Sequence, residues 1–367
     1  MAQGFWRKLA KKTNNNMLAD GLGSAEFDGY IDTGAYTMNM ILSGSVFGGI
    51  PNNSFTGLAG DPATGKTFFA LSISKHFLDS DPEAGVLYGD TESAIQKAVA
   101  ESRGMDTERI TQFEPHTVED FRTDVLKFME VYGDVSSDER PKLMAVLDSL
   151  GNLSTQHELE TTSNFGDTKE AEKKRNTKDM SRPGLIKGSF RLLRQKMAYL
   201  KVPMIITNHV YASMNQYGPQ KEMGGGSGLK YAADSILFLS KAKAKEGDDS
   251  SGEVIGSKIT LTAVKSRLGR ENAKVQVLLN YDTGLDRYYG LMDMAIEAGV
   301  FKVLSKGLEL PGGVKAARKE ILSNPEQIYT KEILEQIDEA AKPRYIYGKG
   351  ERTTMPFIEP EDEIDNG

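Results

Sequence analysis

One segment of eight residues has the composition and spacing of a phosphate-binding loop. The segment fits the pattern G-x-x-x-x-G-K-[ST] and lies between a predicted strand and a predicted helix. Backbone amides of such a loop surround phosphate oxygens, and the N-terminus of the following helix adds a partial positive charge. Lys66 would reach the β- and γ-phosphates, and the Thr67 hydroxyl would bind Mg²⁺. An accidental glycine-rich turn is the alternative, which the flanking elements disfavour. The loop comprises Gly60, Asp61, Pro62, Ala63, Thr64, Gly65, Lys66 and Thr67.

Acidic residues that end two other predicted strands could complete a nucleotide site. The segment "KLMAVLDS" places Asp148 at the carboxyl end of an apolar strand, where open α/β sheets bind their ligands. We therefore expect Asp148 to hold the Mg²⁺ of a bound nucleotide. Hydrolysis also needs a group that orients the attacking water, and "LYGDTES" offers Asp90 and Glu92. Spacing does not choose between these two, because residues two apart on a strand face the same side.

These residues need elements that hold them at one edge of a sheet. Seven short segments rich in branched and aromatic residues are typical of strands buried on both faces. Residues 66–78 and 189–201 repeat apolar side chains at helical spacing. This order predicts an α/β fold with a mostly parallel sheet, helices on both faces, and an antiparallel hairpin of the last two strands at one edge. The predicted strands are residues 54–60, 85–90, 142–149, 202–209, 235–240, 258–265 and 274–280.

The composition excludes several kinds of site. The chain has 367 residues, no cysteine and four scattered histidines, so disulfides and thiolate metal sites are excluded and a histidine-based zinc site is disfavoured. No apolar run approaches the roughly 18 residues that span a bilayer, so we expect a cytoplasmic protein without a membrane partner. The net charge is −7, but basic residues gather at positions 5–12 and 169–178. Because the position of charges matters more than their sum, an acidic total does not exclude DNA.

Changes in composition divide the chain into three regions. Residues 1–28 form a basic, turn-rich arm, and residues 29–290 contain the predicted α/β core. Residues 291–367 contain two helical segments and end in an acidic tail, so we predict a small helical C-terminal subdomain.

Six motifs in a fixed order resemble those of the RecA family of homologous-recombination ATPases, most closely its phage members. The resemblance extends from about Tyr30 to about Ala340 and implies a RecA-like P-loop ATPase core that uses ATP and Mg²⁺. It also implies that Glu92, rather than Asp90, orients the water. The motifs are "GDPATGKT", "YGDTES", "LMAVLDSLGNL", "MIITNHVYAS", "GGGSGLKY" and "AVKSR".

The resemblance further implies roles for the ends of three strands. Asp148 and Ser149 match the family's Walker-B pair, and His209 occupies the position that senses the γ-phosphate. Lys265 and Arg267 match a basic pair that reaches the ATP of a neighbouring subunit, where cations neutralise charge on the phosphates. Two ordinary surface charges on an edge hairpin are the alternative.

The same resemblance implies a subunit interface and a filament. Lys230 and Tyr231 match residues beside the neighbour's nucleotide, so the active site would be complete only between two protomers. The arm, residues 1–28, would contact a neighbouring protomer. We therefore expect a helical homo-oligomer.

Two loops are expected to bind DNA, at about residues 154–184 and 210–228. Each offers cations for phosphates and apolar or aromatic groups for bases. The first loop is longer and more charged than in bacterial RecA. Consecutive glycines end the second loop and suit a hinge between DNA and nucleotide, because glycine adopts conformations closed to other residues. The predicted DNA-binding residues are Lys173, Lys174, Arg175, Arg182, Met214, Tyr217, Lys221, Gly224, Gly225 and Gly226.

Together the motifs indicate a DNA-dependent ATPase that forms a filament on single-stranded DNA and exchanges strands with homologous duplex DNA. Single-strand-binding and loader proteins are expected partners, and the host cytoplasm is the expected location if a phage encodes the chain. A hexameric helicase with the same core is one alternative. A P-loop ATPase that regulates a protein partner without recombination is another.

Overall fold

The computed structural model describes most of the core and of the C-terminal region. The predicted arm, residues 1–28, and the acidic tail lie outside the described residues. No helix in the described part of the chain is long and apolar enough to cross a bilayer. The described residues are 29–93, 95–163, 182–212, 221–224, 228–245, 254–281 and 283–347.

A large sheet organises the core, with strand order β12-β11-β10-β9-β3-β7-β6-β4-β5 and β8 paired to β7. The six strands from β9 to β5 in this order run parallel, whereas β9, β10, β11 and β12 pair antiparallel. The predicted α/β fold with an antiparallel edge is confirmed, and the antiparallel part is larger than one hairpin. The strands are β3 (Phe55–Gly60), β4 (Gly85–Asp90), β5 (Ile110–Phe113), β6 (Leu143–Asp148), β7 (Met204–Ala212), β8 (Lys221–Met223), β9 (Ser235–Lys245), β10 (Val254–Ser266), β11 (Lys274–Asn280) and β12 (Gly284–Leu285).

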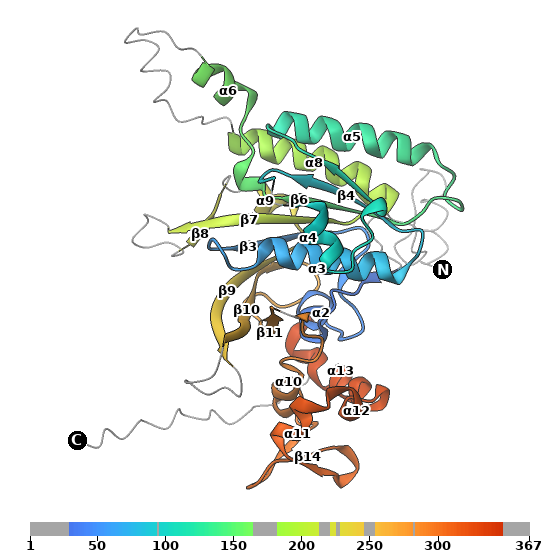
Figure 1. Cartoon of the computed structure of the whole chain (residues 1–367), viewed down its shortest axis with the longest axis vertical. Helices are drawn as coiled ribbons and strands as arrows, with labels where there is room; N and C mark the ends of the chain where they lie inside the picture. Colours follow the sequence, from blue (N-terminus) through green and yellow to red (C-terminus); the bar gives the residue numbers. More distant parts are fainter. Residues whose placement is uncertain are drawn as a thin grey trace, which may run out of the picture.

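Helices cover both faces of the parallel strands (Figure 1). The apolar run of β6 explains how one strand serves two cores, because successive side chains point to opposite faces. Met144 and Val146 pack with the α3 side, while Ala145 and Leu147 pack with the side of α5 and α8. The helices of the core are α2 (Tyr36–Ser43), α3 (Lys66–Ser80), α4 (Lys97–Ser102), α5 (Val118–Asp134), α6 (Gln156–Ser163), α8 (Arg182–Leu200) and α9 (Gly228–Ala232).

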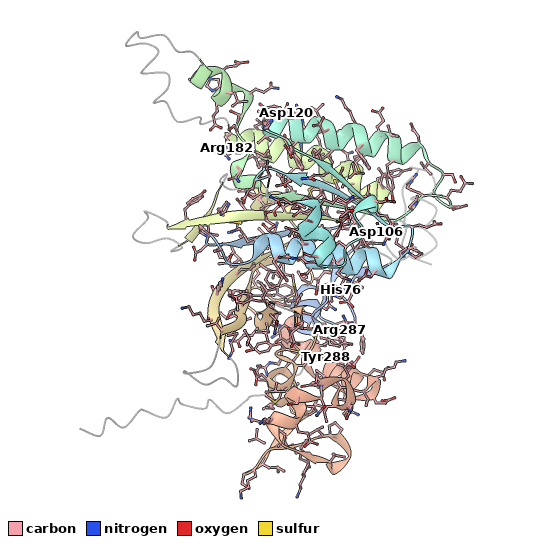
Figure 2. The ribbon with its side chains drawn as sticks, in the orientation of Figure 1. His76, Asp106, Asp120, Arg182, Arg287 and Tyr288 are labelled. Carbon is pink, nitrogen blue, oxygen red and sulfur yellow. The ribbon has the colours of Figure 1, made fainter. Side chains whose placement is uncertain are left out.

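Local sequence explains where the long helix α5 begins. Asp120 lies in the first turn of α5 (Figure 2). The Thr117 side chain accepts a hydrogen bond from the Asp120 amide, and the Asp120 carboxylate accepts one from the Thr117 amide. This reciprocal cap satisfies two amides that have no partner within the helix. The next turn, with Phe121, then packs against Phe190 of α8, with ring centroids 6.2 Å apart.

The C-terminal subdomain corrects one prediction, because it is not entirely helical. A three-stranded antiparallel sheet lies between its helices. Two-residue strands are too short to give a periodic pattern, so the sequence could not predict them. The elements are α10 (Leu291–Glu297), β13 (Lys302–Val303), β14 (Leu308–Glu309), β15 (Lys315–Ala316), α11 (Arg318–Ser323), α12 (Pro325–Ile328) and α13 (Lys331–Tyr345).

Aromatic side chains join this subdomain to the core. Tyr288 packs between Tyr36 of α2 and Tyr329, with ring centroids 5.5 and 5.7 Å away.

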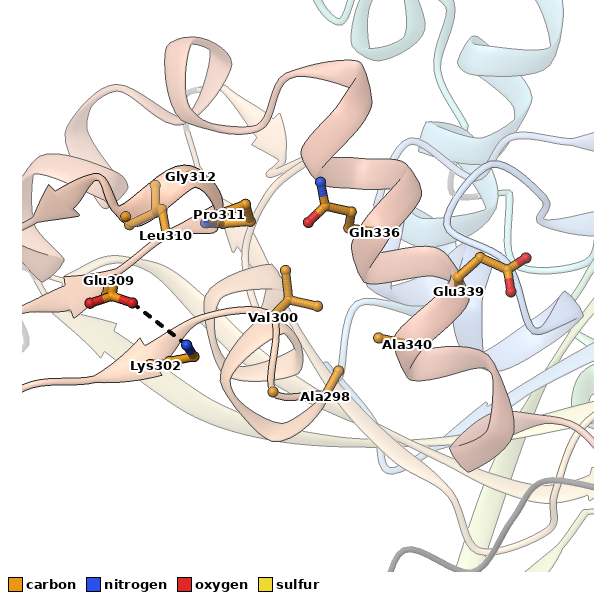
Figure 3. A pocket seen from close by; sticks show the side chains of 12 residues that line it. Ala298, Val300, Lys302, Glu309, Leu310, Pro311, Gly312, Gln336, Glu339 and Ala340 are labelled. Carbon is orange, nitrogen blue, oxygen red and sulfur yellow. Dashed lines mark ion pairs between the residues drawn. The ribbon is translucent and has the colours of Figure 1, made fainter.

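A pocket of about 680 Å³ lies within the subdomain, between α13 and the turn after β14, beside the ion pair of Lys302 and Glu309 (Figure 3).

Candidate nucleotide and DNA sites

The predicted phosphate-binding segment forms the turn between β3 and α3. Gly65 precedes the first helical residue with φ of +92°, a conformation that favours glycine. Gly60 also has no room for a side chain, since a Cβ there would lie 2.6 Å from Thr64 Oγ1 and 3.0 Å from the Leu239 carbonyl oxygen. Glycine is therefore required at both positions, at Gly65 by the backbone conformation and at Gly60 by the lack of space.

Lys66 extends along this turn. Its Nζ donates to the carbonyl oxygens of Gly60, at 3.2 Å, and Asp61, at 3.0 Å. Only 7% of the residue is exposed. Burial lowers the pKa of the Lys66 ammonium, and the nearby carboxylates of Glu92, Asp148 and Asp61 oppose this change. A cation held next to the turn matches the expected phosphate contact.

A pocket of about 450 Å³ brings the predicted nucleotide residues together. Loop residues Pro62, Ala63, Gly65, Lys66 and Thr67 form one wall, and Glu92, Asp148 and His209 form the opposite side. The latter three belong to the ends of β4 and β6 and to β7, which are neighbours in the sheet. The structure thus places residues from four separate motifs around one pocket.

Asp148 is the buried carboxylate of this pocket, with 3% of the residue exposed. Tyr88 Oη donates to its Oδ2 at 3.0 Å, and the Thr207 hydroxyl donates to its Oδ1. Burial, together with the neighbouring Asp148, raises the pKa of the Tyr88 hydroxyl well above its usual value, so this tyrosine stays a donor. The two donors fix the orientation of the carboxylate at the end of β6.

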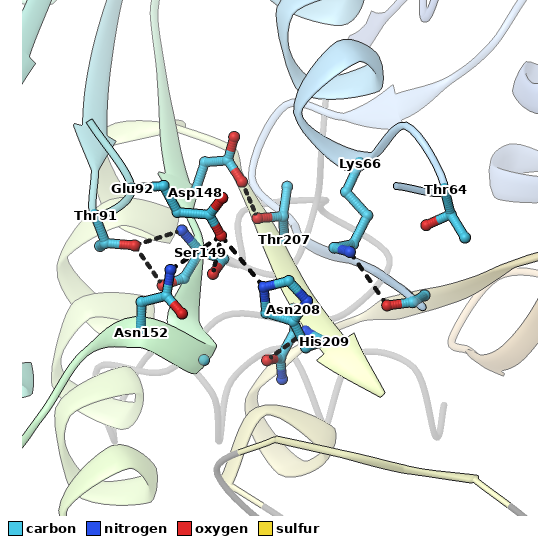
Figure 4. A network of polar contacts seen from close by, with 12 residues as sticks. Thr64, Lys66, Thr91, Glu92, Asp148, Ser149, Asn152, Thr207, Asn208 and His209 are labelled. Carbon is cyan, nitrogen blue, oxygen red and sulfur yellow. Dashed lines mark hydrogen bonds and ion pairs between the residues drawn. The ribbon is translucent and has the colours of Figure 1, made fainter. Parts of the chain in front are cut away.

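Glu92 lies at the centre of a polar network (Figure 4). Ser149 Oγ donates to Glu92 Oε1 at 3.1 Å, and Asn152 Nδ2 donates to the same oxygen at 3.0 Å. His209 Nε2 lies 3.2 Å from it. Thr91 supports this arrangement, since its hydroxyl donates to the Ser149 carbonyl and accepts from the Ser149 amide. Glu92 is therefore oriented toward the pocket by three side chains.

Asp90, the other candidate, is placed differently. Its carboxylate is buried and accepts from the amides of Glu92 and Ile95, at 3.1 and 3.0 Å, and from Gln112 Nε2 at 3.2 Å. These bonds hold the turn after β4. Asp90 thus shapes the segment that carries Glu92 and does not line the pocket.

The basic pair, Lys265 and Arg267, lies at the end of the strands opposite to the phosphate loop. In the β9–β10 register Lys265 pairs with Ile236, and in the β3–β9 register Ile236 pairs with Gly57 near the beginning of β3. The phosphate loop follows the other end of β3. Six strand residues place the two ends of β3 about 17 Å apart. Lys265 and Arg267 are consequently remote from the phosphate loop of their own chain.

The predicted interface residues lie beside this pair. Lys265 Nζ donates to the carbonyl oxygens of Lys230 and Ala233, both at 2.6 Å. Burial, followed by the charge of Arg267, lowers the pKa of the Lys265 ammonium. Tyr231 is exposed, and Lys187 Nζ lies 4.5 Å from the centroid of its ring. Cations and an aromatic ring therefore share one exposed surface.

The sequence is similar to known proteins over most of its length. The family model of the RecA N-terminal domain matches residues 17–286. The chain belongs to the RecA family. The recombination and repair protein of Enterobacteria phage T4, UvsX, is 29% identical over 294 residues, which cover 80% of this chain and 70% of that protein. Protein RecA of Paenarthrobacter aurescens is 25% identical over 306 residues, covering 81% of this chain and 79% of that protein. The resemblance predicted from the motifs is confirmed.

The second predicted DNA loop of this RecA-family chain, residues 210–228, begins in β7 and includes β8, and these two strands pair antiparallel. Gly224, directly after β8, is joined to the nucleotide pocket: its amide donates to the His209 carbonyl at 2.9 Å, and Asn208 Nδ2 donates to its carbonyl at 2.8 Å. Lys221 belongs to β8. Met214, Tyr217, Gly225 and Gly226 lie outside the described residues. Their DNA contacts remain predictions.

The first predicted DNA loop is described only at its two ends, in α6 and α8. Arg182 is the first residue of α8; its Nη2 donates to the Gly151 carbonyl at 3.0 Å, and its Nη1 lies 3.9 Å from Glu158. In this position Arg182 joins the two ends of the loop, and a DNA contact by it stays a prediction. Lys173, Lys174 and Arg175 lie outside the described residues.

Sequence reasoning missed several residues of the site. The quoted motifs contain Asn152, Thr207 and Tyr88 but do not predict their contacts with the acids, which arise because β4, β6 and β7 are neighbours in the sheet. A second pocket, of about 620 Å³, shares Phe68 and Arg103 with the phosphate pocket. Arg103 stacks on Phe68, with its guanidinium carbon 4.4 Å from the ring centroid.

Tyr211 is another missed residue. It lies on β7 in the hairpin of the second loop, and 58% of it is exposed. An exposed aromatic ring at the base of a predicted DNA loop suits stacking on a base. The sequence could not predict the exposure of Tyr211. This exposure depends on β7 continuing beyond His209, the last residue that pairs with β3, to pair with β8.

Proposed function

We propose that this chain is an ATP-dependent recombinase that assembles as a helical filament on single-stranded DNA and exchanges strands with homologous duplex DNA. Membership of the RecA family supports this proposal, as do the name of the phage T4 relative and the nucleotide pocket. Single-stranded DNA would lie against the two loops, and base pairing would test homology.

The residues of the pocket suit ATP hydrolysis. The phosphate loop and Lys66 bind the triphosphate, and Thr67 and Asp148 offer the oxygen ligands that Mg²⁺ prefers beside substrate phosphates. When bound, Mg²⁺ would neutralise negative charge on the phosphates of ATP. Glu92 orients the attacking water and accepts its proton, because three side chains direct its carboxylate into the pocket.

The γ-phosphate end of the pocket is connected to the second DNA loop. His209 contacts Glu92 through its ring and Gly224 through its carbonyl group. A change in the position of the β7–β8 hairpin on DNA binding would therefore move a group that contacts the water-orienting carboxylate. This connection supports stimulation of hydrolysis by DNA.

One observation carries the oligomeric part of the proposal: Lys265 and Arg267 lie at the end of the sheet remote from their own phosphate loop. Cations that match the family's basic pair can therefore reach a nucleotide only on another copy of the chain. Each active site would be completed by a neighbour, and ATP would stabilise the contact between protomers.

Mixing two inactive variants tests this arrangement. Lys66→Ala removes the pocket lysine, and Arg267→Ala removes the arginine supplied to a neighbour. Each variant alone should lose DNA-stimulated ATP hydrolysis. A mixture should regain activity, because Arg267 of one protein meets the intact pocket of the other. No gain above the average of the two separate proteins would contradict action between protomers.

A further inference from the structure

A buried aspartate, Asp234, joins three strands at the end of the sheet that carries the basic pair. It directly precedes β9, and 7% of the residue is exposed. Its Oδ2 accepts from the Phe55 amide at 2.8 Å, and its own amide donates to the Phe55 carbonyl at 2.8 Å. Asp234 is thereby fixed to the beginning of β3.

Two guanidinium groups converge on this single carboxylate. Arg194 of α8 contacts Oδ2, and Arg267 Nη1 lies 3.1 Å from Oδ1. Burial, followed by the charge of Arg267, lowers the pKa of Arg194 to about 10. The two cations repel each other, so the carboxylate between them is what allows both to occupy this position. Removing a charge from such a cluster leaves the others uncompensated.

Arg267 is held at both its backbone and its side chain, yet it faces outward. The Arg267 amide donates to the Asp234 carbonyl at 3.0 Å, in addition to the ion pair of the side chains. The Arg267 side chain is nevertheless 58% exposed. A long side chain fixed by an aspartate and still accessible is oriented before any partner arrives, which reduces the entropy lost on binding.

We infer that Asp234 is a positioning residue for Arg267: its carboxylate holds the guanidinium group in the orientation that meets the nucleotide of a neighbouring protomer. Arg194 keeps that carboxylate in place by neutralising it from the buried side. The inference rests on the proposed function, since it assumes that Arg267 acts on a neighbour. It adds a residue, Asp234, that lies outside the pocket and outside the basic motif.

The first test compares Asp234→Asn with Asp32→Asn. Both changes remove one carboxylate that pairs with an arginine, but Asp32 pairs with Arg287, at 2.7 Å, whereas Asp234 pairs with Arg267. Asparagine at position 234 still accepts from the Phe55 amide. Asp234→Asn should lower the kcat of DNA-stimulated ATP hydrolysis about tenfold with KM for ATP within twofold, because Arg267 acts in the transition state. Asp32→Asn should leave kcat within twofold. Equal kcat in both variants would overturn the inference.

A mixing experiment separates positioning from a structural role. Asp234→Asn protein retains an intact pocket, and Lys66→Ala protein retains an intact Asp234 and Arg267. Their mixture should exceed the average of the separate activities severalfold. A mixture equal to the average would mean that Asp234 serves its own protomer, and the inference would be wrong.

Two further variants keep the outcome clear. If Asp234→Asn does not fold, the double variant Arg194→Met, Asp234→Asn removes both members of the buried pair, so neither charge stays uncompensated. It should show the same loss of kcat, and normal kcat would overturn the inference. The Arg267→Ala variant tests the premise: normal hydrolysis there overturns the proposed function and this inference together. A slow Arg267→Ala with a normal Asp234→Asn overturns the inference alone.

Discussion

Glu92→Gln is the substitution that isolates the chemistry of the pocket. Glutamine is nearly the same size, and its carbonyl oxygen can accept from Ser149 Oγ and Asn152 Nδ2 as Glu92 Oε1 does. The change therefore keeps the geometry and removes the negative charge and the ability to take a proton. Loss of a positioned general base typically lowers a rate by about 10² to 10⁴-fold, which corresponds to about 3–5 kcal/mol of transition-state stabilisation.

The assay is phosphate release with saturating single-stranded DNA, together with binding of a fluorescent ATP analogue. We expect kcat to fall by about 10² to 10⁴-fold, with nucleotide affinity nearly unchanged because the phosphate loop is untouched. Glu309→Gln is the matched control, since Glu309 pairs with Lys302 in the C-terminal subdomain. If Glu92→Gln retained turnover within threefold of the unaltered protein, the assignment of Glu92 as the water-orienting residue would be refuted.

Three other substitutions test separate parts of the account. Asp90→Asn should lower the free energy of unfolding by about 1–3 kcal/mol, measured by urea denaturation, because a buried acceptor of several hydrogen bonds is lost; turnover per folded molecule should fall less than tenfold. Gly224→Val should reduce the stimulation of ATPase by DNA while basal hydrolysis persists, because a Cβ at this position already lies 3.1 Å from the Tyr211 ring and 3.3 Å from Asn208 Oδ1; full stimulation would argue against the coupling. Lys66→Ala should abolish turnover without lowering the thermal midpoint, since burial disfavours the charged lysine. Because the pKa of Lys66 is lowered in the folded protein, burying the charged ammonium group costs free energy at neutral pH, and this cost disappears as the pH rises toward 10.5. Any gain in the free energy of unfolding from Lys66→Ala should therefore shrink as the pH approaches that value.

The parallel core was predictable because its strands are apolar on both faces and its helices are amphipathic. The turn from Gly60 to Thr67 between β3 and α3, and the place of Asp148 at the end of β6, were predictable for a further reason, since a phosphate-loop motif fixes both residue types and spacing. Strand β5 was missed because Ile110–Phe113 spans only four positions and places two polar residues side by side, which gives no strand periodicity. Strand β8 was missed because the surrounding glycine, proline and glutamine residues are typical of a loop.

Contacts between strands could not be predicted from local sequence. The choice between Asp90 and Glu92 depends on where β4 ends: Asp90 turns inward to hold the following amides, while Glu92 lies beyond the strand and faces His209. The role of Asp234 depends on the register of β3, β9 and β10, which places Phe55 and Arg267 next to it. The spacing within a single motif does not predict how strands that are hundreds of residues apart align with one another.

Electron microscopy of the protein with single-stranded DNA, with and without ATP, tests the central claim most directly. A site completed by Arg267 of a neighbouring protomer predicts extended helical filaments that form with ATP and DNA and shorten or disassemble without nucleotide. Closed six-fold rings would favour a helicase, and discrete dimers without DNA affinity would favour a regulatory ATPase. Either result would contradict the account.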